Sequence, residues 1–300
     1  MRRIGFLTVF ARADSEFFLG LIRADLERLG WVDGRNIVLE VRTTEGRNEA
    51  LPPFAAELVA QAPDLILVQT VPATRALMQA TKTIPIVMVS VGNPVEHGLV
   101  ADYRKPGGNV TGSIYPADEA ARKLLQLLKE AAPRLRSVAL FSNPGNEAAA
   151  PMVRMLRADA AALGMQLQVV EVLGKGDFEA AFAAIRNANT HSILLPPEPL
   201  IVNNREAIAA FAQTHALPLA VVGASRNLPA SGLMAFAPTR AEYAQIAARY
   251  VDRILKGAKP SDLAIEQPTR FELVINLKSA KALGLAIPQA LLLRADEVIQ

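Results

Sequence analysis

The segment Ile84–Gly112, IPIVMVSVGNPVEHGLVADYRKPGGNVTG, decides how the rest of the chain is interpreted. It opens with an apolar, largely β-branched run, Ile84–Val91, which ends in a polar turn at Gly92–Pro94. Such a run is typical of a strand covered on both faces, as in parallel α/β sheets. Residues just past the carboxyl end of such a strand lie where open α/β sheets bind ligands. We expect Pro106–Gly112 to lead the chain from one lobe into another, with the ligand between the two lobes.

The composition of the chain favours two ordinary domains. The chain has 300 residues, of which 51% are hydrophobic, and single cores stop growing at about 250–300 residues. Its 32 basic and 29 acidic residues are interleaved and give a net charge of +3, so we expect no nucleic-acid partner. The absence of cysteine excludes a thiolate nucleophile and is compatible with the periplasm as well as the cytosol. No apolar run approaches the roughly 18–20 residues of a membrane span.

Apolar strands alternate with amphipathic helices, which predicts an α/β fold with parallel, doubly wound sheets and right-handed crossovers. Asp14 or Ser15 is expected to cap the first helix. The predicted strands are Ile4–Val9, Ile37–Val41, Leu65–Gln69, Ile84–Val91, Val110–Tyr115, Ser137–Phe141, Leu167–Val172, Ser192–Leu195, Pro218–Val222, Leu233–Phe236 and Phe271–Asn276. The predicted helices are Ser15–Leu29, Glu49–Gln61, one from Thr70–Thr74 to Ala80, Glu119–Ala131, Glu147–Leu163, Phe178–Asn187, Asn204–His215, Arg240–Leu255 and Leu277–Leu283.

The last predicted elements are too many for the second sheet alone. We therefore expect the chain to cross back to the first lobe near Ala237 and out again near Arg270, which gives three crossings. The predicted N-terminal lobe comprises residues 1–112 and 238–269, and the C-terminal lobe residues 113–237 and 270–300.

Four segments carry a resemblance to a known family. They are LGWVDGRNIVLEVRTTEGR at Leu29–Arg47, IPIVMVSVGNPVEHGLV at Ile84–Val100, RKPGGNVTG at Arg104–Gly112 and PTRFELVINLKSAKALGLAIP at Pro268–Pro288. Together they resemble the ABC-transporter substrate-binding proteins of the group that includes tryptophan- and tyrosine-binding lipoproteins. The likeness runs from Ile4 to Val298. It implies the type I periplasmic binding protein fold, in which two α/β lobes are joined by three hinge strands.

The resemblance also implies partners and a location. The partners would be a small-molecule ligand, an ABC permease and its ATPase, with the membrane reached only through the permease or through a lipid anchor that this sequence lacks. The ligand would be an amino acid, with an aromatic one as an option, or another small carboxylate. The location would be periplasmic or otherwise extracytoplasmic. The family carries an export signal before the first strand, and we expect that signal to have been trimmed here.

In the first lobe, Thr70–Thr74 is the segment with the most specific chemistry. It follows the strand that ends at Gln69, and free N–H groups and hydroxyls converge there at the positive end of a helix, where a carboxylate is stabilised. The alternative is that Thr70 or Thr74 only caps the helix.

Other candidate ligand contacts follow neighbouring strands. Thr8 and Phe10 come after the first strand, and Phe10 either stacks on a ligand ring or covers the core. Ser90 and Asn93 end the fourth strand, where Asn93 either binds the ligand or forms a tight turn. Tyr115, at the first crossing, either lines the cleft or packs in the hinge.

In the second lobe, Ser142 and Asn143 follow the first strand and take the place that Thr8 takes in the first lobe. Glu198 is a candidate partner for a ligand ammonium group and Arg226 for an anionic group, and Ser225, beside Arg226, is a further candidate ligand contact. The alternative for Glu198 and Arg226 is a solvated charge at the rim of the site.

Enzyme functions find no support in the sequence. The histidines are His97, His191 and His215, and their spacing matches no metal-binding pattern. The chain contains no GxSxG nucleophile elbow, no GxGxxG dinucleotide loop after the first strand and no phosphate-binding P-loop. We therefore expect neither catalysis, nor a cofactor, nor a metal site.

A second class of protein shares the two-lobed fold, namely the ligand-sensing domains of signalling and regulatory proteins. A transcription regulator of this class would carry a DNA-binding module of roughly 50–60 residues before the first strand. Here three residues precede Ile4, so the transport function is the preferred hypothesis.

Overall fold

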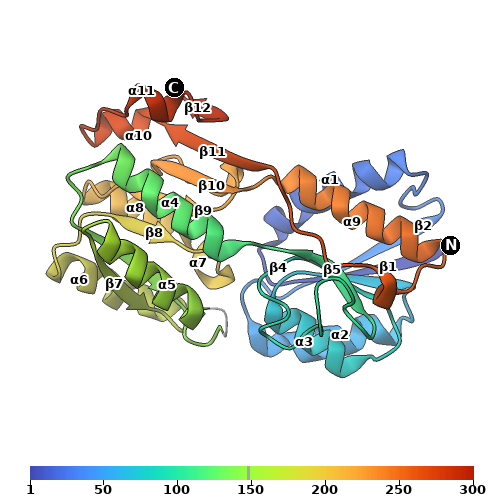
Figure 1. Ribbon diagram of the computed structural model, residues 1–300. Coiled ribbons are helices and arrows are strands. Elements are labelled where there is room, and N and C mark those ends of the chain that lie inside the picture. The colour runs from blue at the N-terminus through green and yellow to red at the C-terminus, as the bar shows by residue number, and fades with distance from the viewer. Residues whose placement is uncertain (147–148) are drawn as a thin grey trace. The chain divides into compact units, whose positions relative to one another are not determined.

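The computed structural model describes residues 1–146 and 149–300, which form two compact units. Unit 1 comprises Met1–Pro116 and Thr239–Thr269, and unit 2 comprises Ala117–Pro238 and Arg270–Gln300. The chain thus passes between the units three times, after Pro116, Pro238 and Thr269. Each unit is built around its own sheet and its own core (Figure 1).

Unit 1 holds a five-stranded sheet in the order β2-β1-β3-β4-β5, in which all neighbouring strands are parallel. This order places β3 at the centre, between β1 and β4, and places β1 between β2 and β3. The strands are β1 (Arg2–Thr8), β2 (Ile37–Thr43), β3 (Leu65–Val68), β4 (Ile86–Val91) and β5 (Val110–Ile114).

Helices cover both faces of this sheet. The helices of unit 1 are α1 (Arg12–Arg28), α2 (Leu51–Ala60), α3 (Val71–Ala80) and α9 (Arg240–Leu255), with short 3-10 turns η1 (Asn48–Ala50) and η4 (Pro260–Asp262). Alternate strand residues point to opposite faces. Phe6 and Val89 therefore pack with α1 and α9, while Val68 and Met88 pack with α2 and α3. Helices α1 and α9 lie side by side although they are far apart in sequence (Figure 1).

The pairing of β4 with β5 requires a glycine. Gly112 has φ 128, and a Cβ atom there would stand 2.1 Å from the carbonyl oxygen of Met88. The register shifts between Met88 and Val91, where β4 carries a bulge. Residues of β5 therefore complete the sheet of unit 1, which continues to Pro116, whereas the predicted N-terminal lobe ended at residue 112.

Unit 2 holds a seven-stranded sheet in the order β12-β11-β10-β9-β8-β6-β7. All neighbours are parallel except β10 and β11, which are antiparallel. The strands are β6 (Ser137–Ser142), β7 (Gln166–Glu171), β8 (Ile193–Leu195), β9 (Leu219–Val222), β10 (Met234–Pro238), β11 (Phe271–Asn276) and β12 (Glu297–Ile299).

The helices of unit 2 also divide between two faces. Helices α4 and α5 pack against each other and against strands β10, β9, β7 and β6, while α6, α7 and α8 bury their apolar residues with Phe141, Ile193 and Val221 on the other face (Figure 1). The helices are α4 (Ala117–Ala131), α5 (Ala149–Ala162), α6 (Phe178–Asn187), α7 (Pro199–Asn203), α8 (Arg205–Thr214), α10 (Leu277–Ala282) and α11 (Gln289–Leu292), with 3-10 turns η2 (Lys175–Asp177) and η3 (Ser225–Asn227).

The predicted α/β class is confirmed, with differences in detail. The prediction that Asp14 or Ser15 caps the first helix is wrong, because α1 begins at Arg12 and its N-cap is Ala11. The Ser15 hydroxyl instead donates to the carbonyl oxygen of Ala11, one turn back. The predicted start of the fifth helix at Glu147 lies outside the described residues.

Candidate ligand-binding site

The first candidate site lies between β1 and β3, where the sheet of unit 1 changes its winding direction. The chain leaves β1 towards α1 on one face and leaves β3 towards α3 on the other, so the two connections diverge at the carboxyl edge. Open α/β sheets bind ligands in the crevice that such a switch point creates. A side-chain hydrogen bond spans it, since the buried Thr8 hydroxyl donates to Gln69 Oε1 at 2.9 Å.

Thr70 and Thr74 take different roles at the start of α3. Thr70 is the N-cap residue, but its side chain makes no capping hydrogen bond, and its buried hydroxyl oxygen has no partner among the described residues. Thr74 is fully buried and donates its hydroxyl to the carbonyl oxygen of Thr70 at 2.8 Å. The capping alternative therefore fails for both side chains. Thr70 keeps an unused hydroxyl beside the free N–H groups of the helix end.

Backbone strain is concentrated at this same edge. Thr70 has φ 74 and ψ 152, a region that is almost confined to glycine. Ser90 and Asn93, at the end of β4, have φ values of 61 and 38. Strained residues of this kind persist only where surrounding structure holds them, and they cluster at binding sites. The three residues therefore make the carboxyl ends of β3 and β4 a candidate place for ligand contact.

Thr44 is a candidate that sequence reasoning missed. It follows β2, is completely buried, and its backbone N–H donates to the carbonyl oxygen of Thr8 at 3.1 Å. Its hydroxyl oxygen has no partner among the described residues. Most buried polar atoms are paired, so an unpaired hydroxyl one residue beyond the level of Thr8 calls for a partner from outside the described residues. No motif in the sequence signals this position.

The two aromatic candidates of unit 1 lie in different surroundings. Phe10 is partly exposed, and its carbonyl oxygen accepts hydrogen bonds from the hydroxyls of Ser15 and Thr43. Tyr115 stacks on Tyr243 of α9, with ring centroids 6.0 Å apart. Burial raises the pKa of Tyr115, and the nearby positive charge of Arg240 opposes that effect. Tyr115 is therefore packed where the chain leaves unit 1, which agrees with its predicted place at the first crossing.

The second candidate site lies at the corresponding switch point of unit 2, between β6 and β8. The chain leaves β6 towards α5 and leaves β8 towards α7 on the opposite face. Asn143 and Glu198 follow these two strands, and Asn143 Nδ2 donates to Glu198 Oε1 at 3.1 Å. Both residues are only 7% exposed. Each unit thus carries one side-chain pair across its switch point, Thr8 with Gln69 and Asn143 with Glu198.

Glu198 is a buried carboxylate and not the solvated rim charge that was one of its two predicted roles. Its Oε2 accepts a hydrogen bond from the Ile201 N–H at 3.1 Å, which caps the short helix α7. Burial raises the pKa of Glu198, and the hydrogen bonds from Asn143 and from the α7 backbone lower it by less. A carboxylate in this setting favours a cationic partner.

Ser225 lies at η3 and is engaged within unit 2. Its N–H donates to Glu272 Oε1 at 2.9 Å and its hydroxyl donates to Glu297 Oε2 at 2.7 Å. These two carboxylates belong to β11 and β12, at the opposite side of the sheet order from β7. Ser225 follows β9, the neighbour of β8, but its hydrogen bonds join it to β11 and β12 and not to the Asn143–Glu198 pair. The side chain of Arg226 lies outside the described residues.

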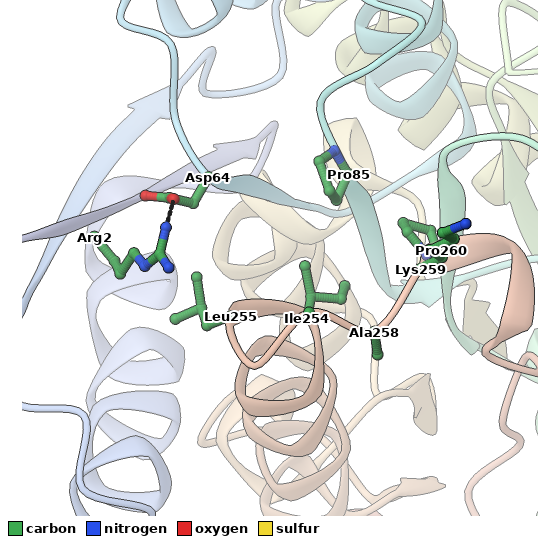
Figure 2. A pocket seen from close by; sticks show the side chains of 9 residues that line it. Arg2, Asp64, Pro85, Ile254, Leu255, Ala258, Lys259 and Pro260 are labelled. Carbon is green, nitrogen blue, oxygen red and sulfur yellow. Dashed lines mark hydrogen bonds and ion pairs between the residues drawn. The ribbon is translucent and has the colours of Figure 1, made fainter.

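A pocket of roughly 360 Å³ lies at the other end of the sheet of unit 1 (Figure 2). Its lining residues come from the start of β1, from the positions just before β3 and β4, and from the end of α9 and the segment after it. The Arg2 guanidinium donates to Asp64 Oδ1 at 2.7 Å on its wall, and Ile254 and Leu255 form its apolar part (Figure 2). No described side chain in its lining has a buried polar atom without a partner. The described lining of this pocket therefore lacks unpaired buried polar groups of the kind that Thr44 and Thr70 provide at the carboxyl edge of the sheet.

Metal-binding clusters and membrane-spanning helices are both absent from the described residues. Residues 1–146 and 149–300 contain no group of three or more histidine, aspartate and glutamate side chains arranged to hold a metal ion. Within the same ranges, no helix combines the length and the hydropathy needed to cross a membrane.

Comparison with known proteins gives a consistent result. A family model described as ABC transporter substrate binding protein matches residues 12–299. A tyrosine-binding protein of Clostridioides difficile is 26% identical over 270 residues, which cover 89% of this chain and 76% of that protein. Two solved structures share the fold over 99% of both chains. One is an ABC domain from Streptococcus pneumoniae in complex with L-Trp, at TM-score 0.90 and 24% identity, and the other is a conserved domain protein from Vibrio cholerae, at TM-score 0.91 and 26% identity.

A more distant structure shows the range of ligands on this architecture. An ABC transporter solute-binding protein from Agrobacterium vitis with bound allitol has a TM-score of 0.63 and 16% identity, over 94% of this chain and 96% of that one. Because the family model spans nearly the whole sequence, and the similar proteins agree with it, this chain belongs to the ABC transporter substrate-binding protein family.

Proposed function

We propose that this protein is the extracytoplasmic receptor of an ABC importer and that it captures an amino acid. Its partners are then a permease and an ATPase, as for substrate-binding proteins in general. The observation that carries the proposal is the pair of polar side chains at each switch point, Thr8–Gln69 in unit 1 and Asn143–Glu198 in unit 2. Substrate-binding proteins hold a ligand and do not transform it, so no catalytic residue is assigned.

The chemistry of the two sites differs in a way that suits a zwitterion. Unit 1 offers neutral donors, namely the unpaired hydroxyls of Thr44 and Thr70 and the N–H groups at the start of α3, and these suit a carboxylate. Unit 2 offers the buried carboxylate of Glu198, which suits an ammonium group. The tyrosine-binding relative and the L-Trp complex support an amino acid, and the partly exposed Phe10 supports an aromatic side chain by stacking.

The remaining predicted contacts complete the proposed site. Ser90 and Asn93 provide polar groups at the end of β4, and Tyr115 lies at the first crossing. Arg226 stays a proposal for an anionic group, and Ser225 stays a proposed ligand contact with less support, because it already donates to two carboxylates.

Ligand capture is proposed to proceed by hinge closure. A ligand that contacts both units only in the closed state stabilises that state, and the permease then distinguishes the closed state from the open one. The rotation would occur near Gly112–Tyr115, Phe236–Thr239 and Pro268–Arg270, beside the three passages between the units. Small-angle scattering should give a smaller radius of gyration at ligand saturation, and an unchanged value at saturation contradicts closure.

A thermal-shift screen followed by calorimetry tests the ligand class. The panel comprises the amino acids, aromatic acids, short peptides and sugars, because a sugar-bound neighbour shares the architecture. A ligand that binds only the folded state raises the melting temperature, by several degrees at concentrations of about 100 times Kd. A selective shift by an amino acid with one-to-one stoichiometry supports the proposal, and a selective shift by a sugar overturns the amino-acid assignment.

A further inference from the structure

Glu198 has an unusual set of partners for a buried carboxyl group. The donors that reach its two oxygens from the described residues are neutral: Asn143 Nδ2 on Oε1 and the Ile201 N–H on Oε2, both at 3.1 Å, with the Leu200 N–H as a further backbone donor. Burying a carboxylate without a positive charge is costly, and the usual result is that the group takes up a proton instead. The direction of its pKa agrees, since burial raises that pKa more than the hydrogen bonds lower it.

No charged side chain of the described residues is among the influences on the pKa of Glu198. On α8, which follows α7, Arg205 donates to the carbonyl oxygen of Val202 and its Nε lies 3.7 Å from the carboxylate of Glu206. Beyond η3, Glu272 and Glu297 both accept hydrogen bonds from Ser225. Glu147 and the side chain of Arg226 lie outside the described residues. Variants of these two residues therefore serve as controls in the experiment.

The orientation of the Asn143 amide is fixed from its other end. Its Oδ1 accepts a hydrogen bond from the Gly145 N–H at 2.9 Å, so its Nδ2 must face Glu198. The amide therefore cannot turn to accept a hydrogen bond from a protonated Glu198. Asn143 favours the charged form of Glu198, while burial favours the neutral form. Because the two effects oppose each other, a change in the surroundings of Glu198 can change its protonation state.

From this geometry we infer that Glu198 is a proton-exchange site, in which the ligand-free protein holds a proton on Glu198 and the cationic group of the ligand displaces it, with Asn143 as the positioning residue. The inference rests on the proposed function, because it assigns the ligand cation to this carboxylate. One O–H bond of Glu198 breaks and its proton passes to water or buffer. The ligand cation replaces that proton as the charge partner, and the ligand itself is chemically unchanged. Ligands without a cationic group bind without releasing this proton.

The first experiment examines the free protein, so its result does not depend on which ligand binds. The carboxyl carbon of Glu198 is followed by carbon NMR as a function of pH and assigned by its loss in Glu198→Gln. The inference expects Glu198 to titrate at a pH clearly above the ordinary glutamate value of about 4.3. Titration at or below that value overturns it. The Asn143→Ala variant should titrate at a still higher pH, because it removes a donor that favours the charged form.

The second experiment measures proton release on binding. L-tyrosine and L-tryptophan are titrated calorimetrically at a series of pH values from about 4.5 to 8, in buffers of different ionisation enthalpy. The inference expects release approaching one proton per ligand, decreasing as the pH rises, and none in Glu198→Gln. It also expects Glu198→Gln to bind at least about tenfold more weakly, since a charge-assisted hydrogen bond becomes a neutral one. The deaminated analogue hydroxyphenylpropionate, which has no ammonium group, should bind without proton release.

The outcomes separate the two proposals. Binding of an amino acid with no proton release at any pH from about 4.5 to 8 overturns proton exchange and leaves the receptor function intact. Failure of every amino acid to bind overturns the amino-acid assignment, and the exchange step with it, while the NMR titration still decides proton uptake by Glu198. The Arg226→Gln and Glu147→Gln variants should keep the proton release. Loss of the proton release in Arg226→Gln would show that Arg226, and not the ligand, supplies the positive charge that displaces the proton. That result would overturn the inference.

Discussion

At the scale of single residues, the unpaired hydroxyls distinguish Thr44 and Thr70 from their neighbours. The hydroxyls of Thr8, Thr43 and Thr74 all have protein acceptors, so they serve the fold. The hydroxyls of Thr44 and Thr70 have no hydrogen-bond partner among the described residues. Removing either hydroxyl therefore leaves no other group of the described chain without a partner. This difference separates effects on binding from effects on stability.

Thr70→Ala is therefore expected to weaken the binding of an acidic ligand by about 1–3 kcal/mol, the range for a lost hydrogen bond to a charged group, with little change in folding stability. Thr70→Ser keeps the hydroxyl and should bind nearly as well as the natural protein. Thr74→Val removes a hydrogen bond inside the protein and should lower stability. Calorimetry gives the affinities and urea unfolding the stabilities. Equal affinity in Thr70→Ala and Thr70→Ser would place the carboxylate elsewhere.

Gly112 gives a second prediction at this scale. An added methyl group would meet the Met88 backbone at 2.1 Å, in a strand pair that cannot separate without breaking the sheet edge. Gly112→Ala should lower the free energy of unfolding by about 3 kcal/mol or more, as large overpacking and strain effects do. Gly20→Ala, in α1 with open space around it, should instead raise stability by about 0.5–1 kcal/mol. Urea unfolding of the two variants side by side checks both, and equal effects would contradict the role of Gly112.

At the scale of elements, α9 carries two of the four tyrosines, and both are buried. Burial raises the pKa of Tyr250 and raises that of Tyr243 well above its ordinary value of 10.0. Tyr243 donates its hydroxyl to the carbonyl oxygen of Ile114 at 3.2 Å, and Tyr250 donates to the carbonyl oxygen of Ala264. A phenol that donates to a carbonyl oxygen cannot ionise without losing that bond.

These tyrosines make the protein sensitive to alkali. Below about pH 10, tyrosine keeps its proton in both the folded and the unfolded chain and contributes no pH dependence. Above it, the unfolded chain loses protons that the folded chain retains, so stability should decrease as the pH rises. Urea unfolding from about pH 8 to 11 measures this loss, and Tyr243→Phe combined with Tyr250→Phe should reduce its slope. The same slope in the double variant would contradict the assignment.

The elements also show what the sequence can and cannot predict. Helices α6 and α9 and strand β11 have the predicted bounds, because their apolar periodicity is strong and their ends are marked. Helix α7 was missed because five residues carry no periodicity, and its cap, Glu198, is held by Asn143 from a distant strand. Strand β12 was missed because three residues become a strand only by pairing with β11. At the site, the residues at the carboxyl edge of each sheet can be predicted from where the strands end in the sequence. An unpaired hydroxyl such as that of Thr44 cannot be predicted in this way, because it depends on which atoms surround it in the folded protein.

At the scale of the whole molecule, the first turns of α9 touch the chain beside all three passages between the units. Thr239, at the second passage, is the N-cap and accepts from the Glu242 N–H. The carboxylate of Glu242 accepts from the N–H and the hydroxyl of Thr269, at the third passage. Tyr243 reaches the Ile114 carbonyl near the first passage. One helix end therefore anchors the three connecting segments within unit 1.

Glu242→Ala removes several of these hydrogen bonds at once. It should lower the free energy of unfolding by about 1–3 kcal/mol, since the lost bonds involve a charged acceptor. Glu27→Ala, an exposed position in the last turns of α1, is the matched control and should change stability by no more than about 0.5 kcal/mol. Thermal unfolding of both variants measures the difference. Equal stabilities would show that the α9 anchor adds nothing to the fold.

The interleaved course of the chain has a consequence for synthesis. The first 116 residues leave the ribosome without α9, whose Tyr250 and Val251 belong to the same core as Ile4 and Phe6 of β1. The missing helix emerges about 140 residues later, which at roughly 5–20 residues per second is a delay of about 10–30 seconds. During that interval the amino-terminal segment lacks one wall of its core. The order of elements along the chain thus leaves the core of unit 1 incomplete until most of the chain has been synthesised.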